Sequence, residues 1–457
     1  MAGQNVLIQS GPEDDEGDAL LAIATQAGVP KHMKLGLVQM KDQERMDRLT
    51  AQCAVQPGLG KVYSQILLQS HTSAEFYLKD IFPSLVGKTF GEARRSFDQA
   101  VLCGVMDVGT GQAHLSPADS CVLTEQHRLV FLSSTAKIQP SKQAMSKLSL
   151  ERSATTAVAS DAPAHEGSEV RHKKHVVVIG WDVDQTVEGL LKGLGDFAPD
   201  DSSITIISPE KPGDFLEAKG ACHCRHLEGS IASRQVLLEA GVAEADAVIL
   251  RMPLQSLAAA DADAQVVSSL VQLQDLASHS DRTDPLHVIA PVNHPRTLEL
   301  INFVTKQSCS RAVTGQHVIG AVKAVTGDPQ HASHGDSGSS RGQDESMALN
   351  VDVLLPDELL SGLLTQVSVQ PELLSVMNDL FDAEGVEIYL RDPSRYSISQ
   401  DHASPVIFAD VAEAVRAQKE TALGYLLQDG TVLTAPHADH KQVLKAGDQI
   451  IAFANYA

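Results

Sequence analysis

The chain has 457 residues, a length typical of about three domains, which excludes a single small module. Hydrophobic residues make up 43% and charged residues 21%, which is ordinary globular usage and excludes a wholly disordered or fibrous chain. The formal net charge of -22 repels phosphate backbones and anionic lipid headgroups, so we expect no nucleic acid as a partner.

The chain shows no sign of membrane insertion or export. Its apolar stretches are strand-sized, whereas a spanning helix needs about 20 mainly apolar residues. An acidic run at residues 13–16 precedes Lys31, the first basic residue, which is the wrong charge for a signal or transit peptide. Six cysteines are too sparse for a disulfide framework and indicate a reducing compartment. We therefore expect a soluble chain without a membrane span.

The N-terminal third divides into three segments. Residues 1–50 contain one stretch of strand character at residues 34–40, so we expect only a partial stump of a Rossmann-like lobe. This stump indicates either a truncated gene model or an incomplete lobe. Residues 51–136 have the pattern of a small α+β lobe. Residues 137–172 are rich in Ser, Ala, Thr, Lys and Gln, which predicts a flexible linker.

Residues 173–325 alternate short apolar runs with helical stretches, which predicts a doubly wound parallel α/β sheet. The expected strands are residues 175–180, 204–208, 247–251 and 287–292. The expected helices are residues 186–194, 231–240, 262–276 and 296–303. Residues 326–346 are of low complexity and predict a flexible insertion, and residues 347–457 predict a second small α+β lobe.

The two small lobes share an internal repeat. The strand-like residues 100–105 recur at residues 421–426, and each is followed by a turn, a proline and a last apolar strand. From Gly104 to Pro117 the separation is 13 residues, and from Gly424 to Pro436 it is 12. One extra turn residue explains the difference. The chain is therefore predicted to be a tandem duplication.

Several strings resemble one family. Residues 52–59 have the sequence Gln52-Cys53-Ala54-Val55-Gln56-Pro57-Gly58-Leu59. This string, together with residues 74–77 and 100–105, is similar to the cytoplasmic region of the plant CASTOR and POLLUX ion channels. In the second half, residues 176–181 and 380–387 resemble the family's second regulator-of-conductance (RCK) domain. The resemblance covers residues 34–136 and 173–457. The alternating strand and helix pattern alone would not identify a family, whereas the string at residues 52–59 is specific.

The resemblance implies tandem RCK-like units that form a gating ring under a tetrameric cation pore. It also implies attachment to a membrane channel, with the nuclear envelope as the expected site, and a role in calcium signalling. We therefore expect a soluble regulatory module that senses a ligand or ion and couples it to ion transport. Its expected partner is a second copy of the chain or a channel pore subunit. The chain has no pore helices or selectivity filter, so we expect it not to conduct ions alone.

Two alternatives to the channel module remain open. One is a nucleotide-binding α/β enzyme related to oxidoreductases, and the other is a pore-less assembly subunit. The sequence has no Gly-x-Ser-x-Gly or His-Glu-x-x-His motif, and Cys53 has no acidic or histidine partner nearby in sequence. We therefore expect no enzymatic activity.

The first strand of the α/β lobe leads into the candidate cofactor-binding residues Gly180, Trp181 and Asp182. A pyrophosphate loop needs Gly-x-Gly-x-x-Gly, but only one glycine is present here and the aspartates would repel phosphate. The cofactor is therefore unknown, and the sequence argues against NAD. Asp182 and Asp184 could instead hold a divalent cation. The simpler alternative is a solvated turn that caps the following helix.

A second acidic group suggests calcium as a ligand. Asp379 and Asp382 are three residues apart and share one face of an expected helix, close to Glu384. Together with Asp182 and Asp184, they are the candidate calcium ligands. The simpler alternative is that these carboxylates only keep the helix soluble.

Soft-ligand residues form three further groups, each weighed against a structural alternative. In a strand, Cys222, Cys224 and His226 of the first group would share one face, but no further ligand would complete a metal site. This pattern favours small core cysteines and surface histidines. The two histidine pairs are expected to be solvated. The groups are Cys222, His223, Cys224 and His226; His331 and His334; and His437 and His440.

Overall fold

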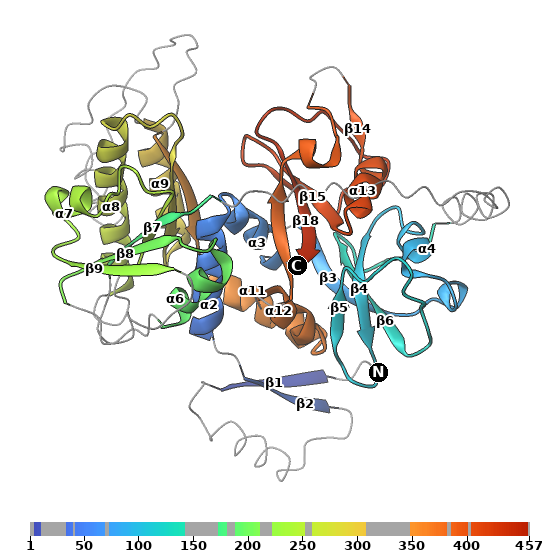
Figure 1. The fold of residues 1–457 in the computed structure, drawn as a ribbon. Helices are drawn as coiled ribbons and strands as arrows, with labels where there is room; N and C mark the ends of the chain where they lie inside the picture. Colours follow the sequence, from blue (N-terminus) through green and yellow to red (C-terminus); the bar gives the residue numbers. More distant parts are fainter. Residues whose placement is uncertain are drawn as a thin grey trace, which may run out of the picture. The chain divides into compact units, whose positions relative to one another are not determined.

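The computed structural model describes residues 4–10, 33–39, 42–68, 73–141, 172–180, 188–210, 222–251, 258–307, 348–381, 385–400 and 404–455. The chain forms two compact units (Figure 1). Unit 1 contains Met1–Arg45, Lys61–Val170 and Glu358–Ala457, and unit 2 contains Met46–Gly60 and Arg171–Asp357. Each unit therefore combines segments that are far apart in the sequence.

Unit 2 is built on a six-stranded sheet with the order β12-β11-β10-β7-β8-β9. Every neighbouring pair is parallel. The strands are β7 (His175–Ile179), β8 (Ser203–Ser208), β9 (His223–Glu228), β10 (Ala247–Leu250), β11 (Leu286–Pro291) and β12 (Leu349–Leu354). The strand order reverses between β7 and β10, as in a doubly wound Rossmann sheet. This result confirms the predicted fold class.

Helices cover both faces of this sheet (Figure 1). They are α6 (Glu188–Phe197), α7 (Arg234–Glu239), α8 (Ala259–Ser278), α9 (Pro295–Gln307) and α2 (Asp42–Val55). On one face Leu250, Val266 and Ile301 belong to a single buried core with residues of α7, α8 and α9. Helices α2 and α6 lie on the other face. Short apolar strands covered on both sides account for the continuous apolar runs seen in the sequence.

The turn after α2 docks on the edge of the sheet. Asp352 of β12 is fully buried, and its Oδ2 accepts a hydrogen bond from the Gly58 N–H at 2.7 Å. His287 of β11 donates from Nε2 to the Cys53 carbonyl at 2.8 Å. The string that carries the family resemblance therefore has a structural role, because it attaches α2 to β11 and β12.

Strand β12 differs from the sequence-based division of the chain. That division assigned residues 347–457 to the small lobe, whereas β12 pairs with β11 from Leu286↔Leu349 to Pro291↔Leu354 and completes the unit 2 sheet. The low-complexity stretch before residue 347 separates this strand from the rest of its sheet in sequence, so its membership was not visible. Similarly, residues 51–60 belong to unit 2.

The N-terminal segment contains two strands. The expected strand at residues 34–40 is present as β2 (Met33–Gln39), and β1 (Gln4–Ser10) pairs with it in parallel from Gln4↔Met33. Strand β1 was not expected from the sequence.

Unit 1 contains two small lobes with the same topology. The first has the antiparallel order β3-β6-β4-β5, and the second has the order β13-β18-β15-β16. The first set is β3 (Glu75–Asp80), β4 (Val101–Asp107), β5 (Ala113–Leu115) and β6 (His127–Ser133). The second set is β13 (Val386–Arg391), β15 (Thr421–Leu426), β16 (Val432–Thr434) and β18 (Gln449–Asn455). The shared strand order confirms the tandem duplication.

The marker glycines of the repeat occupy equivalent positions. Both lie at a register shift, Gly104 where β4 pairs with β6 and Gly424 where β15 pairs with β18. A Cβ at Gly104 would lie 2.4 Å from the His114 carbonyl oxygen, and one at Gly424 would lie 1.9 Å from the Leu433 carbonyl oxygen. Only glycine permits this close approach of the two backbones.

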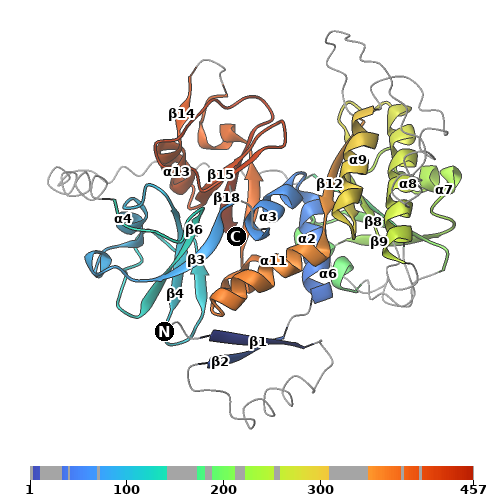
Figure 2. The ribbon, with the colours of Figure 1, turned by 180° about the vertical axis from the view of Figure 1, so that it is seen from behind.

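Helices complete unit 1, and Figure 2 shows α3 and α11 from behind. The Tyr63 ring of α3 stacks on Phe381 of α12 at 5.7 Å, and the Gln366 Nε2 of α11 donates to the Ile66 carbonyl at 2.8 Å. The helices are α3 (Leu59–Leu67), α4 (Phe90–Arg94), α11 (Pro356–Val369), α12 (Leu373–Phe381) and α13 (Phe408–Ala417). Two 3₁₀ helices, Pro83–Leu85 and Pro393–Tyr396, and the short pair β14 (Val406–Ile407) and β17 (Lys441–Gln442) complete the lobes. Within the described residues, no helix combines the length and apolar character needed to cross a membrane.

Candidate functional site

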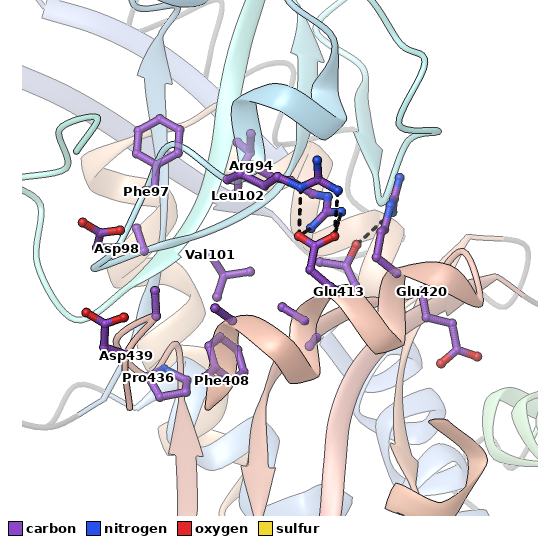
Figure 3. A pocket seen from close by; sticks show the side chains of 18 residues that line it. Arg94, Phe97, Asp98, Val101, Leu102, Phe408, Glu413, Glu420, Pro436 and Asp439 are labelled. Carbon is purple, nitrogen blue, oxygen red and sulfur yellow. Dashed lines mark hydrogen bonds and ion pairs between the residues drawn. The ribbon is translucent and has the colours of Figure 1, made fainter. Parts of the chain in front are cut away.

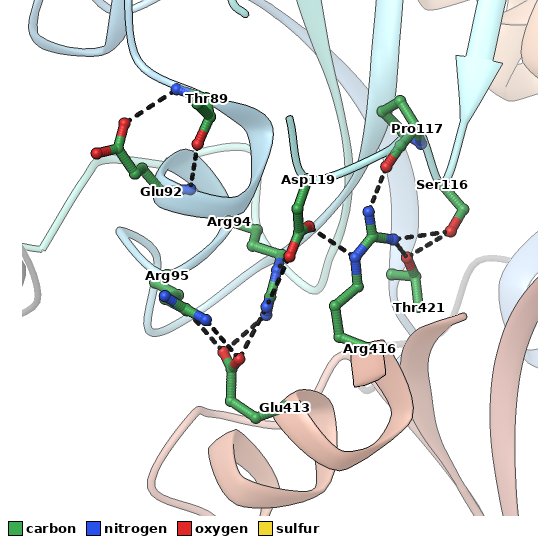
Figure 4. Close-up of polar contacts among 10 residues, drawn as sticks. All are labelled: Thr89, Glu92, Arg94, Arg95, Ser116, Pro117, Asp119, Glu413, Arg416 and Thr421. Carbon is green, nitrogen blue, oxygen red and sulfur yellow. Dashed lines mark hydrogen bonds and ion pairs between the residues drawn. The ribbon is translucent and has the colours of Figure 1, made fainter. Parts of the chain in front are cut away.

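The site lies inside unit 1, where the two small lobes meet. On the first lobe, a capping box defines the start of α4: Thr89 Oγ1 accepts the Glu92 N–H at 3.2 Å, and Glu92 Oε2 accepts the Thr89 N–H at 3.0 Å. This arrangement satisfies two backbone donors of the helix start. Arg94 and Arg95 then follow at the end of α4, and both reach toward α13 of the second lobe (Figure 4).

The carboxylate of Glu413 in α13 accepts hydrogen bonds from both arginines. Arg94 donates from Nη1 and Nη2 to its two carboxylate oxygens at 2.7 and 2.8 Å. Arg95 donates from Nε and Nη2 at 2.9 and 2.8 Å. One carboxylate is thus held by two guanidinium forks, which is the geometry of strong, directional ion pairing.

The protonation state of Glu413 follows from these contacts. Burial alone raises the pKa of its carboxyl group, but hydrogen bonds from Arg95 and Arg94 outweigh burial and lower the pKa from 4.5 to about 2. Glu413 is therefore ionised at any physiological pH. Its side chain keeps 44% of its surface exposed, so solvent screens part of the attraction.

Arg416 makes a second connection between the lobes. Its Nε donates to Asp119 Oδ1 at 2.6 Å, its Nη1 donates to Ser116 Oγ at 3.1 Å, and its Nη2 donates to the Pro117 carbonyl. The Arg416 side chain is only 7% exposed. Because all three acceptors belong to the first lobe, this buried arginine fills the loop at residues 116–119.

A cavity of about 470 Å³ lies beside these ion pairs (Figure 3). Its apolar walls come from both lobes and include Phe97, Val101, Phe408 and Pro436. The volume is within the range of small-molecule sites, which measure about 300–1,000 Å³. The joint between the lobes therefore has room for a ligand of small-molecule size.

Two aspartates line the cavity at a distance from the arginines. Figure 3 shows Asp98 and Asp439 at one end, together with Phe97 and Pro436, while Arg94 and Glu413 lie toward the other. Within the part of the chain that the structure describes, neither aspartate makes a side-chain hydrogen bond or ion pair. The Asp98 carbonyl accepts the Ala438 N–H at 2.8 Å. The cavity therefore has an anionic end and an apolar middle.

Of the predicted cofactor residues, only Gly180 is described. It follows β7 at the reversal point of the unit 2 sheet, has φ +91°, and its N–H donates to the Ile207 carbonyl at 3.1 Å. Trp181, Asp182 and Asp184 lie outside the described residues, so their cofactor and metal roles stay predictions.

Of the second predicted metal group, only Asp379 is described. It lies near the end of α12 and is half-buried. Asp382 and Glu384 lie outside the described residues, so the metal role of this group stays a prediction. Within the described ranges, no three His, Cys, Asp or Glu side chains form a metal-ligating group.

The soft-ligand residues are dispersed. Cys222 and Cys224 are half-buried at β9, and burial raises the pKa of both thiols. The His226 Nε2 lies 2.8 Å from Ser208 Oγ, whereas His223 is exposed. His437 is exposed and lines a smaller cavity of about 290 Å³ that also borders Asp98, and the His440 carbonyl accepts the Phe408 N–H. His331 and His334 lie outside the described residues.

Sequence analysis missed the residues that join the lobes. Arg95 and Glu413 are separated by 318 positions, so no motif of local spacing could connect them. One signal was available in the repeat itself, because α4 and α13 occupy equivalent positions. Both helices begin with a phenylalanine whose N–H donates to the equivalent loop, to Cys121 and His440 respectively.

The fold is similar to that of a solved gating ring. The structure of the human SLO3 gating ring matches the whole chain and 82% of its own length, with a TM-score of 0.60 and 10% sequence identity. At this identity the match establishes the fold alone. The chain therefore has the fold of a tandem RCK gating ring subunit.

Sequence comparison finds relatives among plant ion channels. Residues 43–149 match the family model described as "Castor and Pollux, part of voltage-gated ion channel". The Arabidopsis thaliana "Probable ion channel POLLUX" is 25% identical over 381 residues, which are 83% of this chain and 43% of the relative. The Lotus japonicus "Ion channel CASTOR" is 25% identical over 403 residues, covering 83% and 42%. The resemblance predicted from residues 52–59 is confirmed, and the chain spans about two-fifths of these relatives.

Proposed function

We propose that the chain is a regulatory module of a CASTOR/POLLUX-like cation channel, in which a ligand or ion changes the joint between the two small lobes. The observation that carries this proposal is the duplicated pair of lobes, joined through Glu413 and Arg416 around a cavity. A ligand shifts a conformational equilibrium only by its difference in affinity between two states. A cavity bounded by two lobes offers such a difference, because its shape depends on their arrangement.

Channel recording tests the proposal. The chain would be co-expressed with the Lotus japonicus ion channel CASTOR, and cation currents would be compared with those of the channel alone. We expect the wild-type chain to alter the current, and Glu413→Arg to abolish the effect because it places like charges against Arg94 and Arg95. Glu125→Arg, at an exposed position of the first lobe, is the matched control. Identical currents with and without the wild-type chain would contradict the proposal.

The module is proposed to act in an oligomer. RCK units bury apolar surface by pairing, and four chains under a tetrameric pore would supply a ring of eight units. The isolated chain is expected to form monomers or dimers. A stable tetramer at micromolar concentration, measured by light scattering, would contradict this expectation.

Calcium is the proposed ion, and the carboxylates at Asp182, Asp184, Asp379, Asp382 and Glu384 are its proposed ligands. The charge of -22 concentrates cations at the surface, and gathering several copies would raise their mutual repulsion. Calcium that binds only the native state must raise the melting temperature. The absence of both binding heat and a thermal shift at millimolar calcium would exclude the idea.

The cellular setting is proposed from the same resemblance. The chain would attach to a channel of the nuclear envelope and support calcium signalling there. A fluorescent fusion expressed at the native level would show a perinuclear ring in this case. Uniform fluorescence across the cell would exclude the nuclear envelope.

One observation favours a different function. The unit 2 sheet has the strand order of dinucleotide-binding enzymes, and Gly180 lies at its reversal point. Fold analogy alone supports this alternative, since the other glycines of the phosphate loop are missing. Saturable NAD(H) binding with turnover of a hydroxy acid would favour the enzyme over the channel module. A pore-less assembly subunit would instead alter channel abundance without altering the response of the current to a ligand.

A further inference from the structure

The two small lobes present equivalent loops to each other, but among the described residues a side chain of the opposite lobe enters only the first of these loops. The loop at residues 116–121 begins at Ser116 with φ 46°, and the loop at residues 435–440 begins at Ala435 with φ 45°. In the first loop the Asp119 carbonyl accepts the Gly91 N–H, and in the second the Ala438 carbonyl accepts the Ala409 N–H. These matching contacts make the two loops structural counterparts.

The first loop receives an arginine from the opposite lobe. Arg416 enters it and donates to Asp119 and to the Pro117 carbonyl. The second loop lines the cavity through Pro436, Ala438 and Asp439. Of the described side chains of the first lobe, none makes an ion pair or side-chain hydrogen bond to this loop, although the Ala438 N–H donates to the Asp98 carbonyl. The two copies of the repeat therefore differ here: the first loop holds the guanidinium group of Arg416, whereas the second loop leaves room for a cation.

The side chains that line the cavity next to the second loop are suited to binding a cation. Asp98 and Asp439 line it without a side-chain partner among the described residues, whereas Glu413 and Glu420 on the same cavity wall are already paired with arginines. Phe97 and Phe408 contribute aromatic surface, which attracts cations electrostatically. Small alanines make up much of the remaining wall and leave the space open.

We propose that this cavity binds a small organic cation with a guanidinium or ammonium group attached to an apolar body. The charged group lies at Asp98 and Asp439, in the place that corresponds to Arg416 on the other side. The apolar body lies against Phe97 and Phe408. An inorganic ion would leave most of the volume of about 470 Å³ unfilled, whereas an anion would face two carboxylates. The inference deepens the proposed function, because it names a ligand class for the joint between the lobes.

Calorimetric titration of the full chain tests the proposal, with benzylguanidinium as the probe. Phenylacetate and 2-phenylethanol serve as an anionic and a neutral probe of similar size. We expect saturable binding of benzylguanidinium at one site per chain and much weaker binding of the other two. Equal binding of all three probes would show that the charge plays no part and would overturn the proposal. The same holds if millimolar calcium displaces benzylguanidinium stoichiometrically, because the site then belongs to the metal ion.

Variants locate the site. Asp98→Asn and Asp439→Asn should each weaken benzylguanidinium binding about tenfold, since each removes one charge-assisted contact. Ala412→Leu should abolish binding by filling the cavity, whereas Ala417→Leu, at an exposed position of the same helix, should not change it. Glu125→Gln is the charge control. Unchanged affinity in Ala412→Leu, with its fold verified by circular dichroism, would place the probe elsewhere and refute the assignment.

The binding test is independent of channel recording. If benzylguanidinium binds as expected but the chain leaves CASTOR currents unaltered, the cation site stands and the channel module fails. If the currents respond to the chain but the probe does not bind, the ligand assignment alone fails.

Discussion

Replacing Glu413 by Gln should weaken unit 1 in a pH-dependent way. The folded state lowers the pKa of this carboxyl group from 4.5 to about 2. At 1.36 kcal/mol per pKa unit, the shift sets a ceiling of about 3 kcal/mol on its contribution to the free energy of unfolding. The side chain is 44% exposed, so solvent screening reduces the expected loss to about 1–2 kcal/mol at pH 7.

The sign of the pH dependence follows from the lowered pKa. A carboxyl group that is more acidic in the folded state stabilises the fold above its unfolded pKa, and the contribution is lost as the pH falls from about 4.5 toward 2. The difference in the free energy of unfolding between wild type and Glu413→Gln should therefore have its full value at pH 7 and should be mostly lost by about pH 3.

Urea unfolding can isolate unit 1, because the aromatic residues are unevenly distributed. All six tyrosines fall in the segments of unit 1, and the single tryptophan, Trp181, falls in those of unit 2. Near-ultraviolet circular dichroism of tyrosine should shift to lower urea in Glu413→Gln, while tryptophan fluorescence should not. Glu125→Gln should match wild type in both signals. An equal loss for Glu413→Gln at pH 7 and pH 3 would refute the assignment of the ion pair.

Three further substitutions test the packing. Gly424→Ala should destabilise unit 1 by about 2 kcal/mol in tyrosine-monitored urea unfolding, since its Cβ would enter the backbone of β16; wild-type stability would contradict the close approach. Asp352→Ala should lower the tryptophan-monitored stability of unit 2 by about 1–3 kcal/mol, because the buried Gly58 N–H loses its acceptor, and no change would show that this contact is dispensable. Arg251→Met should lower the free energy of unfolding of unit 2 by about 3–5 kcal/mol in the same assay, because it breaks the buried ion pair in which Arg251 Nη1 contacts Asp47 Oδ1 at 2.8 Å; a loss below 1 kcal/mol would show that this ion pair contributes little to stability.

The fold was largely predictable because its signals are local. The parallel sheet follows from apolar runs such as residues 175–179 and 247–250, which alternate with helices and need no knowledge of distant contacts. The duplication was visible because Gly104 and Gly424 are both required by the same backbone approach. Strand β12 could not be assigned to its sheet, since a helix and the low-complexity residues 326–346 separate it in sequence from its pairing partner β11.

The joint between the lobes was beyond sequence analysis for a physical reason. Arginine and glutamate are common on protein surfaces. An arginine or glutamate that joins two lobes differs from an ordinary surface residue only in which residue it contacts in the fold. In the sequence, Glu413 cannot be told from an ordinary residue on the solvated face of a helix. Only the fold shows that Arg94 and Arg95 lie beside it. The cavity is a property of two lobes together, so neither copy of the repeat contains it alone.

The discontinuous make-up of unit 1 has a consequence for biosynthesis. Arg95 emerges from the ribosome 318 residues before Glu413, which at about 5–20 residues per second amounts to roughly 16–60 s. During this interval the first lobe can fold around its own core and Arg94 can pair with Asp119 of the same lobe, but Glu413, which Arg94 and Arg95 both contact in the finished fold, has not been translated. The nascent chain therefore carries these two arginines for the whole of that interval without the carboxylate that offsets their charge in the finished fold.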